Sequence, residues 1–257
     1  MSTAPVETRV LETPVLETRG LSVNFGGLKA VDQVDLKVRR GGITSIIGPN
    51  GAGKSTFYNL VTGAIRPSAG RVMLDGLDIT GMPTHELIGL GLSRSFQITN
   101  LFPASTVFEN LRLAAQVLEP SRLALLPVRH SKRAAAKAEE LIERFGLAAK
   151  ATELAGHLSH GEQRRLEIAV ALACEPRILI LDEPTQGMSH TDTEEASRMV
   201  AGLGRDMTIV LIEHDLDLVM DLSHTVFVLA QGRKLAEGTP AEVRANKDVQ
   251  TAYFGAH

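Results

Sequence analysis

A short glycine-rich run ends in a lysine and a serine, a combination that suits phosphate chemistry. The run Gly48-Pro49-Asn50-Gly51-Ala52-Gly53-Lys54-Ser55 fits the pattern G-x-x-x-x-G-K-[ST] at every fixed position. Glycines let successive backbone N–H groups converge on phosphate oxygens, and the positive end of a following helix adds to the attraction. The lysine would reach the outer phosphates as a point charge, and the serine would offer its hydroxyl to Mg2+. The predicted phosphate contacts are Asn50, Gly51, Gly53, Lys54, Ser55 and Thr56.

Two adjacent carboxylates follow an apolar run farther along the chain. Residues 178–181 are typical of a buried strand, and Asp182 and Glu183 come directly after them. Asp182 is placed to anchor Mg2+, and Glu183 is the predicted general base that orients a water attacking the terminal phosphate. An acidic turn after a strand is the alternative, and it would be preferred if the pair stood alone. The phosphate loop upstream, on the same kind of sheet, favours the catalytic interpretation.

The glycine-rich loop needs a strand before it and a helix after it. Residues 43–47 predict a buried strand that leads into the loop, and residues 53–61 predict the helix that follows. Apolar strands are also predicted at 177–181 and 207–212 with a helical stretch between them, which is the alternation of a mostly parallel sheet. The remaining predicted elements are antiparallel strands within 21–39, strands at 225–230 and 233–236, and short helices from Ala241 and from Asp248.

A second region, roughly residues 86–157, has a helical pattern. Ala138, Leu141, Ile142 and Phe145 fall at i, i+3, i+4 and i+7, which is the apolar stripe of an amphipathic helix. Gly146 is placed to end that helix. The sequence therefore predicts an α/β core that is interrupted by a helical region.

Composition and charge narrow the class of protein. The chain has 257 residues, a hydrophobic fraction of 44% and a formal net charge of -3, which allow a sizeable core but give no basic field for nucleic acid. The lone cysteine, Cys174, excludes an intramolecular disulfide, and we expect it to be a small buried apolar residue. No apolar run approaches the roughly 20 residues that span a bilayer, and no targeting pattern opens the chain. We therefore expect a cytoplasmic protein.

A third motif gives the phosphate loop a more specific context. The run Leu158-Ser159-His160-Gly161-Glu162-Gln163-Arg164-Arg165 precedes an amphipathic stretch. It resembles the Leu-Ser-Gly-Gly-Gln signature of the ABC ATPase family, with His160 and Glu162 where the family has glycine and glutamine. In that family the serine and second glycine open a helix that faces the γ-phosphate of ATP bound by another ATPase subunit. The resemblance assigns this contact to Ser159 and Gly161, whereas Ser159 alone would be an ordinary helix cap.

Further family elements follow in the expected order. The resemblance implies that Gln97 touches Mg2+ or the attacking water, and that His214 is the switch histidine that binds the γ-phosphate. It also implies that Phe25 stacks on adenine with Val31 beside the base, although a core aromatic is a nearly equal alternative for Phe25. Ser189 stands where the family has an aspartate, so communication between the two ATP sites is expected to differ.

The resemblance extends from about residue 16 to 255 and implies a fold. That fold is α/β: a P-loop NTPase core with a mostly parallel sheet, an N-terminal antiparallel β subdomain and an inserted α-helical subdomain at about 86–174. We expect residues 1–14 to be a tail and residues 15–257 to form a single ABC ATPase domain. Within the family, three segments look like the ATPases of branched-chain amino-acid importers, the LivG-type branch: 25–31, 164–169 and 242–255.

That branch implies cofactors and partners as well. ATP and Mg2+ are the expected cofactors. The expected partners are a second ATPase subunit, membrane permease subunits and, indirectly, a periplasmic solute-binding protein, with no nucleic acid and with the chain at the cytoplasmic face of the inner membrane. The expected cargo is branched-chain or other hydrophobic amino acids or related small solutes.

Other classes of protein remain alternatives. The chain could be the ATPase of a lipopolysaccharide-export system, or a soluble ABC ATPase that takes no part in transport. A phosphate-loop kinase or GTPase is disfavoured because it would not need Ser159, Gly161 or His214.

Overall fold

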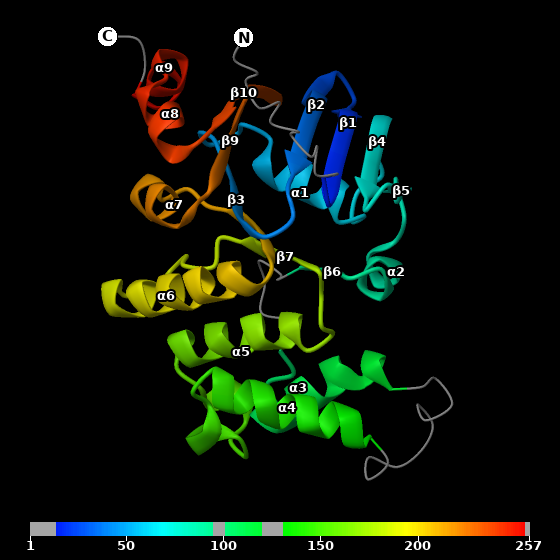
Figure 1. Cartoon of the computed structure of the whole chain (residues 1–257), viewed down its shortest axis with the longest axis vertical. Helices are drawn as coiled ribbons and strands as arrows, with labels where there is room; N and C mark the ends of the chain where they lie inside the picture. The colour runs from blue at the N-terminus through cyan, green and yellow to red at the C-terminus, as the bar shows by residue number, and fades with distance from the viewer. Residues whose placement is uncertain (1–13, 95–100, 120–130, 255–257) are drawn as a thin grey trace, which may run out of the picture.

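The computed structural model describes residues 14–94, 101–119 and 131–254, and within these residues the strands form two sheets. The first sheet is antiparallel and lies at the upper right of Figure 1. Its strands are, in spatial order, β2 (Leu28–Val38), β1 (Leu16–Phe25), β4 (Ala69–Leu74) and β5 (Leu77–Asp78).

The second sheet carries the central strands of the molecule. Its spatial order is β10 (Arg233–Gly238), β9 (Thr225–Ala230), β3 (Gly42–Ile47), β8 (Thr208–Ile212), β7 (Ile178–Asp182) and β6 (Leu92–Arg94). The pairs from β9 to β6 are parallel, and β10 runs antiparallel to β9. Every residue of β7 and β8 is buried, as expected for parallel strands that are covered on both faces.

Alternate side chains of the central strands enter different hydrophobic clusters. Ile178 and Ile180 face a cluster shared with the antiparallel sheet and with α1 (Lys54–Val61), which contributes Phe57 and Leu60. Leu179 and Leu181 point the other way, into a cluster shared with the helices below the sheet. The helix after the glycine-rich loop therefore packs between the two sheets, while the opposite face of the central sheet supports the helical part of the chain.

A helical lobe, residues 101–119 and 131–172, lies below the strands in Figure 1. Gly146 takes a φ of 63° just after α4, and the N–H of Leu147 reaches back to the carbonyl of Ile142 at 2.9 Å, which closes the end of that helix. The lobe is made of α3 (Val107–Ala114), α4 (Lys132–Arg144), α5 (His160–Leu172) and the short 3₁₀ helices Ala115–Leu118, Ala148–Lys150 and Ala155–His157.

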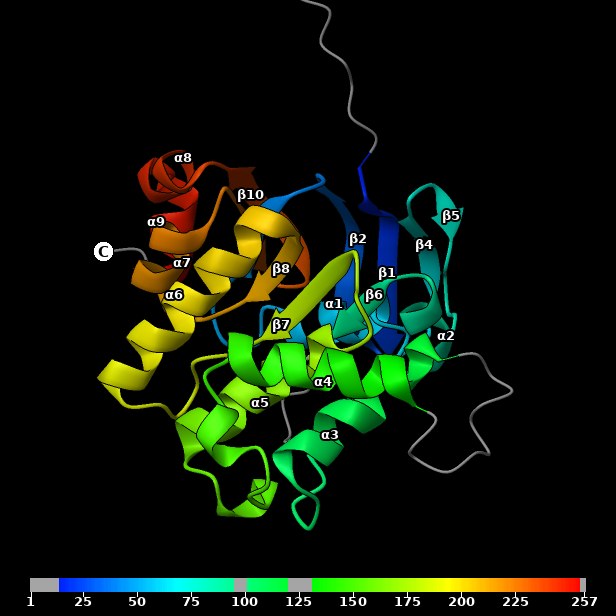
Figure 2. The same cartoon turned by 60° about the horizontal axis from the view of Figure 1, so that its bottom comes forward.

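The remaining helices lie around the core. Figure 2 shows α6 beside the central sheet, with α4 and α5 crossing below it. These remaining helices are α2 (Thr84–Gly89), α6 (His190–Asp206), α7 (Leu216–Leu222), α8 (Pro240–Ala245) and α9 (Lys247–Phe254). Among the described residues, no helix is both long enough and apolar enough to cross a membrane.

The predicted fold class is confirmed, because an antiparallel sheet, a mostly parallel sheet and a helical lobe all occur in the expected order. The predicted strand at 225–230 coincides with β9, and the predicted helix with the stripe 138–145 is the second half of α4. The tail proposed for residues 1–14 lies almost wholly outside the described residues, and the limits of the helical subdomain stay a prediction.

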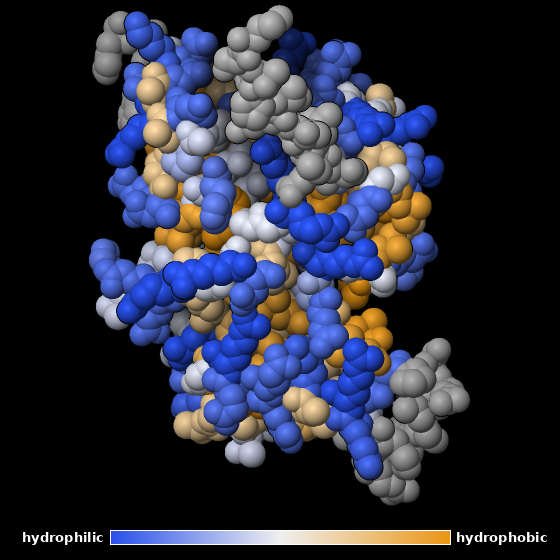
Figure 3. All heavy atoms as spheres, viewed as in Figure 1, coloured by the Kyte–Doolittle hydropathy of each residue, from blue (hydrophilic) through white to orange (hydrophobic). Residues whose placement is uncertain are grey.

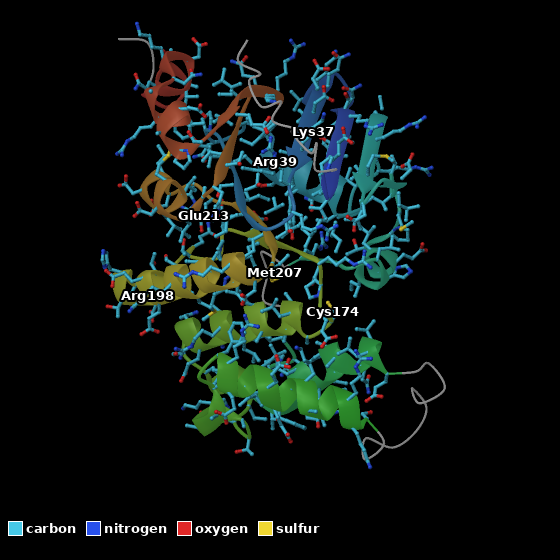
Figure 4. The ribbon with its side chains drawn as sticks, in the orientation of Figure 1. Lys37, Arg39, Cys174, Arg198, Met207 and Glu213 are labelled. Atoms are coloured by element: carbon cyan, nitrogen blue, oxygen red, sulfur yellow. The ribbon has the colours of Figure 1, made fainter. Side chains whose placement is uncertain are left out.

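Cys174 departs from the sequence-based expectation. Its side chain is only partly buried, just after α5 (Figure 4). Its Sγ lies 3.5 Å from the carbonyl oxygen of Ala171, and burial raises the pKa of the thiol. The residue therefore lies two positions beyond the end of α5, beside a surface groove, and does not lie inside the core.

The first testable prediction concerns the packing of α1 between the sheets. Phe57 and Phe227 are both almost fully buried and stack with ring centroids 6.3 Å apart. Phe57→Ala should lower the free energy of unfolding by about 3–5 kcal/mol, because it removes a large buried ring. Phe25→Ala is the matched control, since that ring is 51% exposed and its loss should cost about 0.5 kcal/mol or less. Urea denaturation measures both, and equal effects would contradict the packing described here.

Candidate functional site

The glycine-rich loop leads from β3 into a helix whose start is bare. Gly53 is the N-cap of α1, with a φ of 96°, and it has no side chain that could cap the helix. The first turn of α1 also contains no acidic residue. Because the first N–H groups of a helix have no partner inside the helix, this end presents free donors and a positive dipole. Asn50, Gly51 and Ser55 are exposed there, and Thr56 is half-buried. An anion such as a phosphate group fits these donors.

Lys54 points back into the loop. Its side chain is almost fully buried, and its Nζ donates to the carbonyl oxygens of Gly48 at 2.7 Å and Pro49 at 3.2 Å. Burial lowers the pKa of Lys54, while the nearby charges of Glu183 and Asp182 act in the opposite direction. The structure therefore brings the lysine and the two carboxylates, which are far apart in sequence, into one site.

Asp182 and Glu183 end β7 in different environments. Asp182 is 2% exposed, and burial, with the charges of Glu183 and Glu213, raises its pKa to about 6. Arg164 and Lys54 oppose that rise. Glu183 takes a φ of 44°, an uncommon backbone conformation for a side chain of this size, and its N–H donates to the carbonyl of Ile212 at 2.8 Å. Such strain is held only where the surrounding structure fixes it.

His214 lies against both neighbouring glutamates. Its Nδ1 is 3.6 Å from Glu183 Oε1 and 3.6 Å from Glu213 Oε2, and its side chain is 54% exposed. The exposed imidazole can therefore reach a ligand while its ring is oriented by carboxylates.

Glu213 is a residue whose role sequence analysis missed. It is fully buried, and its carboxylate accepts hydrogen bonds from Thr185 N at 3.2 Å, Thr185 Oγ1 at 2.7 Å and His214 N at 3.2 Å. Figure 4 shows it at the end of β8, above α6. It ties the loop after β7 to the loop after β8. The available signal was a charge at the end of an otherwise apolar strand.

Arg164 is the second residue that sequence analysis did not assign. Its guanidinium donates to the carbonyl oxygens of Asp182 at 3.0 Å, Glu183 at 3.0 Å and Pro184 at 2.9 Å, and it also binds Glu167. These contacts fasten α5 of the helical lobe to the backbone that carries both carboxylates. The spacing of residues in the sequence does not predict such a contact. An arginine on a helix is usually solvated, so the residue type does not indicate it either.

The N-terminus of α5 is already occupied by one of its own side chains. Ser159 is the N-cap, and its hydroxyl accepts from Glu162 N at 3.3 Å. The Glu162 carboxylate in turn accepts from Ser159 N at 2.8 Å and from Ser159 Oγ at 2.9 Å, and the Ser159 backbone N–H lowers the pKa of Glu162. Gly161 packs closely on α6, since an added Cβ would lie 2.8 Å from Asp192 Oδ1. In the described residues, no hydrogen bond or ion pair joins Ser159 or Gly161 to the phosphate loop.

The two residues predicted to contact a base differ in exposure. Phe25 is 51% exposed at the end of β1, so the alternative that it is a core aromatic is wrong. Val31 is fully buried in the core around α1, so its side chain has no surface that could touch a base. The structure contradicts the predicted contact of the Val31 side chain with the base, and this side chain packs in the core instead. The expected contact of Gln97 lies outside the described residues.

Comparison with known proteins agrees with this arrangement. Residues 31–186 match the family described as ABC transporter, and residues 233–257 match the one described as Branched-chain amino acid ATP-binding cassette transporter. The chain therefore belongs to the ATP-binding cassette family of ABC transporters, and it is an ATPase.

Curated relatives point to one branch of the family. The chain is 43% identical to the high-affinity branched-chain amino acid transport ATP-binding protein BraF of Pseudomonas aeruginosa, over 95% of this chain and 99% of the relative. It is 41% identical to LivG of Escherichia coli, which has the same description, over the same shares of both chains. The lipopolysaccharide export ATP-binding protein LptB of Haemophilus influenzae is 31% identical to the chain, over 94% of this chain and 97% of the relative.

Solved structures share the fold over nearly the whole chain. A nucleotide-free ATP-binding cassette from an ABC transporter superposes with a TM-score of 0.83 at 31% identity, covering 95% of this chain and all of the other. A dimeric cassette in a post-hydrolysis state, bound to ADP and Pi, superposes with a TM-score of 0.74 at 25% identity. The match covers 88% of this chain and 98% of the other.

The raised pKa of Asp182 predicts a pH-dependent stability. A carboxyl group whose pKa is about 6 in the folded chain and roughly 3.9 when unfolded favours folding at low pH, and that contribution is lost as pH rises from about 4 to 6. Asp182→Asn removes the ionisation. It should therefore raise the stability of the nucleotide-free chain by about 3 kcal/mol at pH 7.5 and by about 1 kcal/mol at pH 4.5.

Urea unfolding in EDTA at the two pH values measures this difference. Asp221→Asn, at an exposed site in α7, is the matched control and should not change the difference between the two pH values. A stability gain for Asp182→Asn that is equal at both pH values would contradict the assignment.

Proposed function

We propose that the chain is the ATP-hydrolysing motor of an importer that takes up branched-chain or other hydrophobic amino acids, or related small solutes. The observation that carries the ATP part is the meeting of three features: the bare start of α1, the buried Lys54, and the carboxylates that end β7. Uncapped N–H groups attract phosphate, and a carboxylate pair beside them can serve a cation and a water.

The phosphate loop would hold the nucleotide, and Mg2+ would neutralise its phosphates when bound. The residues proposed as its ligands are Ser55, Asp182 and Gln97, all of which offer oxygen atoms, the donors that Mg2+ prefers. When nucleotide binds, the Lys54 ammonium group would leave the carbonyl oxygens of Gly48 and Pro49 and bind phosphate oxygens instead. Burial favours this change because the ammonium group is poorly hydrated, and an anion stabilises its charge. Asn50, Gly51, Gly53 and Thr56 complete the proposed phosphate contacts.

Glu183 is the proposed general base. It follows the buried end of β7, its backbone is fixed by Ile212 and Arg164, and His214 lies beside its carboxylate. A base in this position takes a proton from the water that attacks the γ-phosphate, while His214 donates a hydrogen bond to that phosphate. The exposed Phe25 is the proposed stacking partner of adenine.

A second ATPase chain would complete the site. Ser159 and Gly161 open α5 and, within the described residues, make no hydrogen bond or ion pair with the phosphate loop of their own chain, so their proposed ligand is nucleotide held by another chain, with the Ser159 hydroxyl released from Glu162. The dimeric relative bound to ADP and Pi supports such pairing.

A groove beside the site suits a permease. It is lined by α2, β6, α5 and the end of the first 3₁₀ helix, with Ile88, Leu92, Val117 and Val170 among its apolar residues. Hydrophobic atoms are visible on that side of the molecule in Figure 3, at the right of the view. β6 pairs directly with β7, with Arg94 opposite Ile180, so one wall of the groove is bonded to the strand that carries the carboxylates. A coupling segment of a membrane permease is the proposed occupant, and the proposed location of the chain is accordingly the cytoplasmic face of the inner membrane.

The cargo class rests on the relatives. BraF and LivG are both branched-chain amino acid transport proteins, and the match at residues 233–257 is to the same branch. The identity to LptB is lower than the identity to BraF or LivG, which disfavours lipopolysaccharide export. The similarity to transport proteins also disfavours an ATPase that takes no part in transport. A periplasmic solute-binding protein would deliver the cargo to the permeases.

The role of Glu183 makes a direct kinetic prediction. Glu183→Gln keeps the side-chain shape and removes the base, so ATP turnover should fall by about 10²–10⁴-fold while ATP binding persists. Lys54→Ala is the matched comparison and should weaken binding itself. Steady-state phosphate release and equilibrium nucleotide binding separate the two effects. Turnover at the wild-type rate in Glu183→Gln would exclude this residue as the base.

The groove makes a prediction about assembly. Val117 is 52% exposed in it, so Val117→Asp should fold normally but lose co-purification with its permeases from native membranes, because a charge enters an apolar contact. Leu28→Asp is the control, since Leu28 is 67% exposed on the antiparallel sheet away from the groove. Mass spectrometry of the purified complex identifies the partners. Equal recovery of permeases by both variants would contradict the proposed docking site. Recovery of the wild-type chain with ribosomes or DNA would contradict the proposed role in an importer.

A further inference from the structure

One glutamate of α5 lines two hollows of the molecule at once. The groove proposed for the permease has a volume of about 290 Å³, and Glu167 is among its walls. A second cavity, of about 280 Å³, lies beside the carboxylates that end β7, with Asp182, Glu183, Arg164 and Glu167 among its walls. Among the described residues, Glu167 is the only one that lines both. It therefore touches the proposed partner surface and the proposed site of hydrolysis.

Glu167 forms an ion pair with Arg164 on the same helix. The two residues are three positions apart, and Arg164 Nη1 lies 2.5 Å from Glu167 Oε2. Both side chains are mostly buried, with 14% of Arg164 and 11% of Glu167 exposed. An ion pair with so little exposure is held firmly, because a charge left buried without its partner is strongly unfavourable. Glu167 therefore fixes the direction in which the guanidinium of Arg164 points.

The other nitrogens of Arg164 bind the backbone that follows β7. Nε donates to the carbonyl oxygen of Pro184 at 2.9 Å, and Nη2 donates to those of Asp182 and Glu183 at 3.0 Å each. A guanidinium is planar and rigid, so its donors keep fixed directions relative to one another. The carboxylate of Glu167 and the three carbonyl groups of this backbone are therefore held in one arrangement.

The backbone conformation at Glu183 depends on such restraints. Its φ of 44° is uncommon for a residue with a long side chain, and such a conformation persists only where neighbours enforce it. The N–H of Glu183 is held by the carbonyl of Ile212 in β8, at 2.8 Å, and its carbonyl is held by Arg164, at 3.0 Å. The direction in which the Glu183 side chain leaves the strand therefore depends on Arg164 and, through it, on Glu167.

Loss of the Glu167 charge would disturb this arrangement. The guanidinium of Arg164 would then be a mostly buried cation without its counter-ion, and it would shift toward water or toward another anion. Either shift draws its donors away from the carbonyl groups that they bind. An occupant of the groove that pushed on Glu167 would act on the backbone of Glu183 in the same way.

We propose that Glu167 is a positioning residue that orients Glu183 through Arg164, and that an occupant of the groove alters ATP hydrolysis by moving this ion pair. The inference rests on the proposed function, in which Glu183 is the general base and the groove receives a permease. It adds a connection through side chains to the one that the pairing of β6 with β7 makes through the backbone.

Glu167→Gln in the full-length chain tests the positioning role, because it removes the charge and keeps the shape. The turnover number should fall about tenfold through misplacement of the base, while the dissociation constant for a non-hydrolysable ATP analogue should stay within about twofold of wild type. Glu140→Gln is the matched control. It breaks the ion pair of Lys137 with Glu140, also three residues apart, in α4, and should leave turnover within about twofold of wild type.

Arg164→Lys separates positioning from simple destabilisation. Lysine keeps the positive charge, but its ammonium group cannot bind three carbonyl groups and a carboxylate in the same geometry. Turnover should fall as in Glu167→Gln, and the double variant should be no slower than the slower single variant, because both changes break one arrangement. Effects that multiply in the double variant, wild-type turnover in Glu167→Gln, or a loss of analogue affinity as large as the loss of turnover would each overturn the positioning role.

The link to the groove is tested in the assembled complex. Turnover is measured for the complex purified from native membranes and for the chain alone. In wild type the two rates should differ by about fivefold or more, and in Glu167→Gln they should become equal.

The same rate ratio in both proteins, or equal rates in wild type, would overturn the link. Loss of the permeases from Glu167→Gln would also overturn it, since the residue would then act in docking. The proposed function fails by separate results, which are wild-type turnover in Glu183→Gln or permeases retained by Val117→Asp.

Discussion

The register of the central parallel strands is the constraint on which the site depends. Ile46 of β3 pairs with Ile212 of β8, and Ile212 pairs with Asp182 of β7. Because these strands run in the same direction, the residues that follow them leave the sheet at one edge. The phosphate loop, the two carboxylates of β7 and the Glu213–His214 pair are brought together by backbone hydrogen bonds and not by attraction between their charges. A shift of β7 by a single residue would turn Asp182 to the other face of the sheet.

That constraint concentrates negative charge in a place where water is scarce. Asp182 and Glu213 are buried beside Glu183, and within the described residues the charges of Arg164 and Lys54 oppose this negative charge at Asp182. Like charges in a buried site raise the free energy of the folded chain unless cations balance them. Part of this imbalance is relieved by Lys54 and Arg164 and part by the hydrogen bonds that Glu213 accepts from Thr185 and His214. The nucleotide-free chain is therefore prepared to gain stability from a bound cation.

Sequence alone predicted the parts that depend on local pattern and on motifs. The strand, loop and helix at residues 43–61 and the acidic end of β7 could be named because their residue types are unusual and their order is fixed. The family resemblance picked out His214, and the structure adds that it lies beside Glu183. The sequence did not reveal that Glu213 is fully buried, that Arg164 binds three carbonyl groups, or that Val31 has no exposed surface. Those facts depend on contacts between segments far apart in the chain, which periodicity does not encode. Exposure also excluded the core alternative for Phe25, which the residue type alone could not do, and its stacking on adenine stays a proposal.

The capping box at Ser159 has a consequence for how two such chains would meet. Glu162 accepts hydrogen bonds from the backbone N–H and the hydroxyl of Ser159. If the Ser159 hydroxyl turned to a γ-phosphate held by a partner chain, as proposed, Glu162 would lose that bond but would stay at the same helix end. Two negative groups would then share the positive end of one helix dipole. In the proposed pairing, Glu162 would therefore weaken the attraction of α5 for the partner's phosphate.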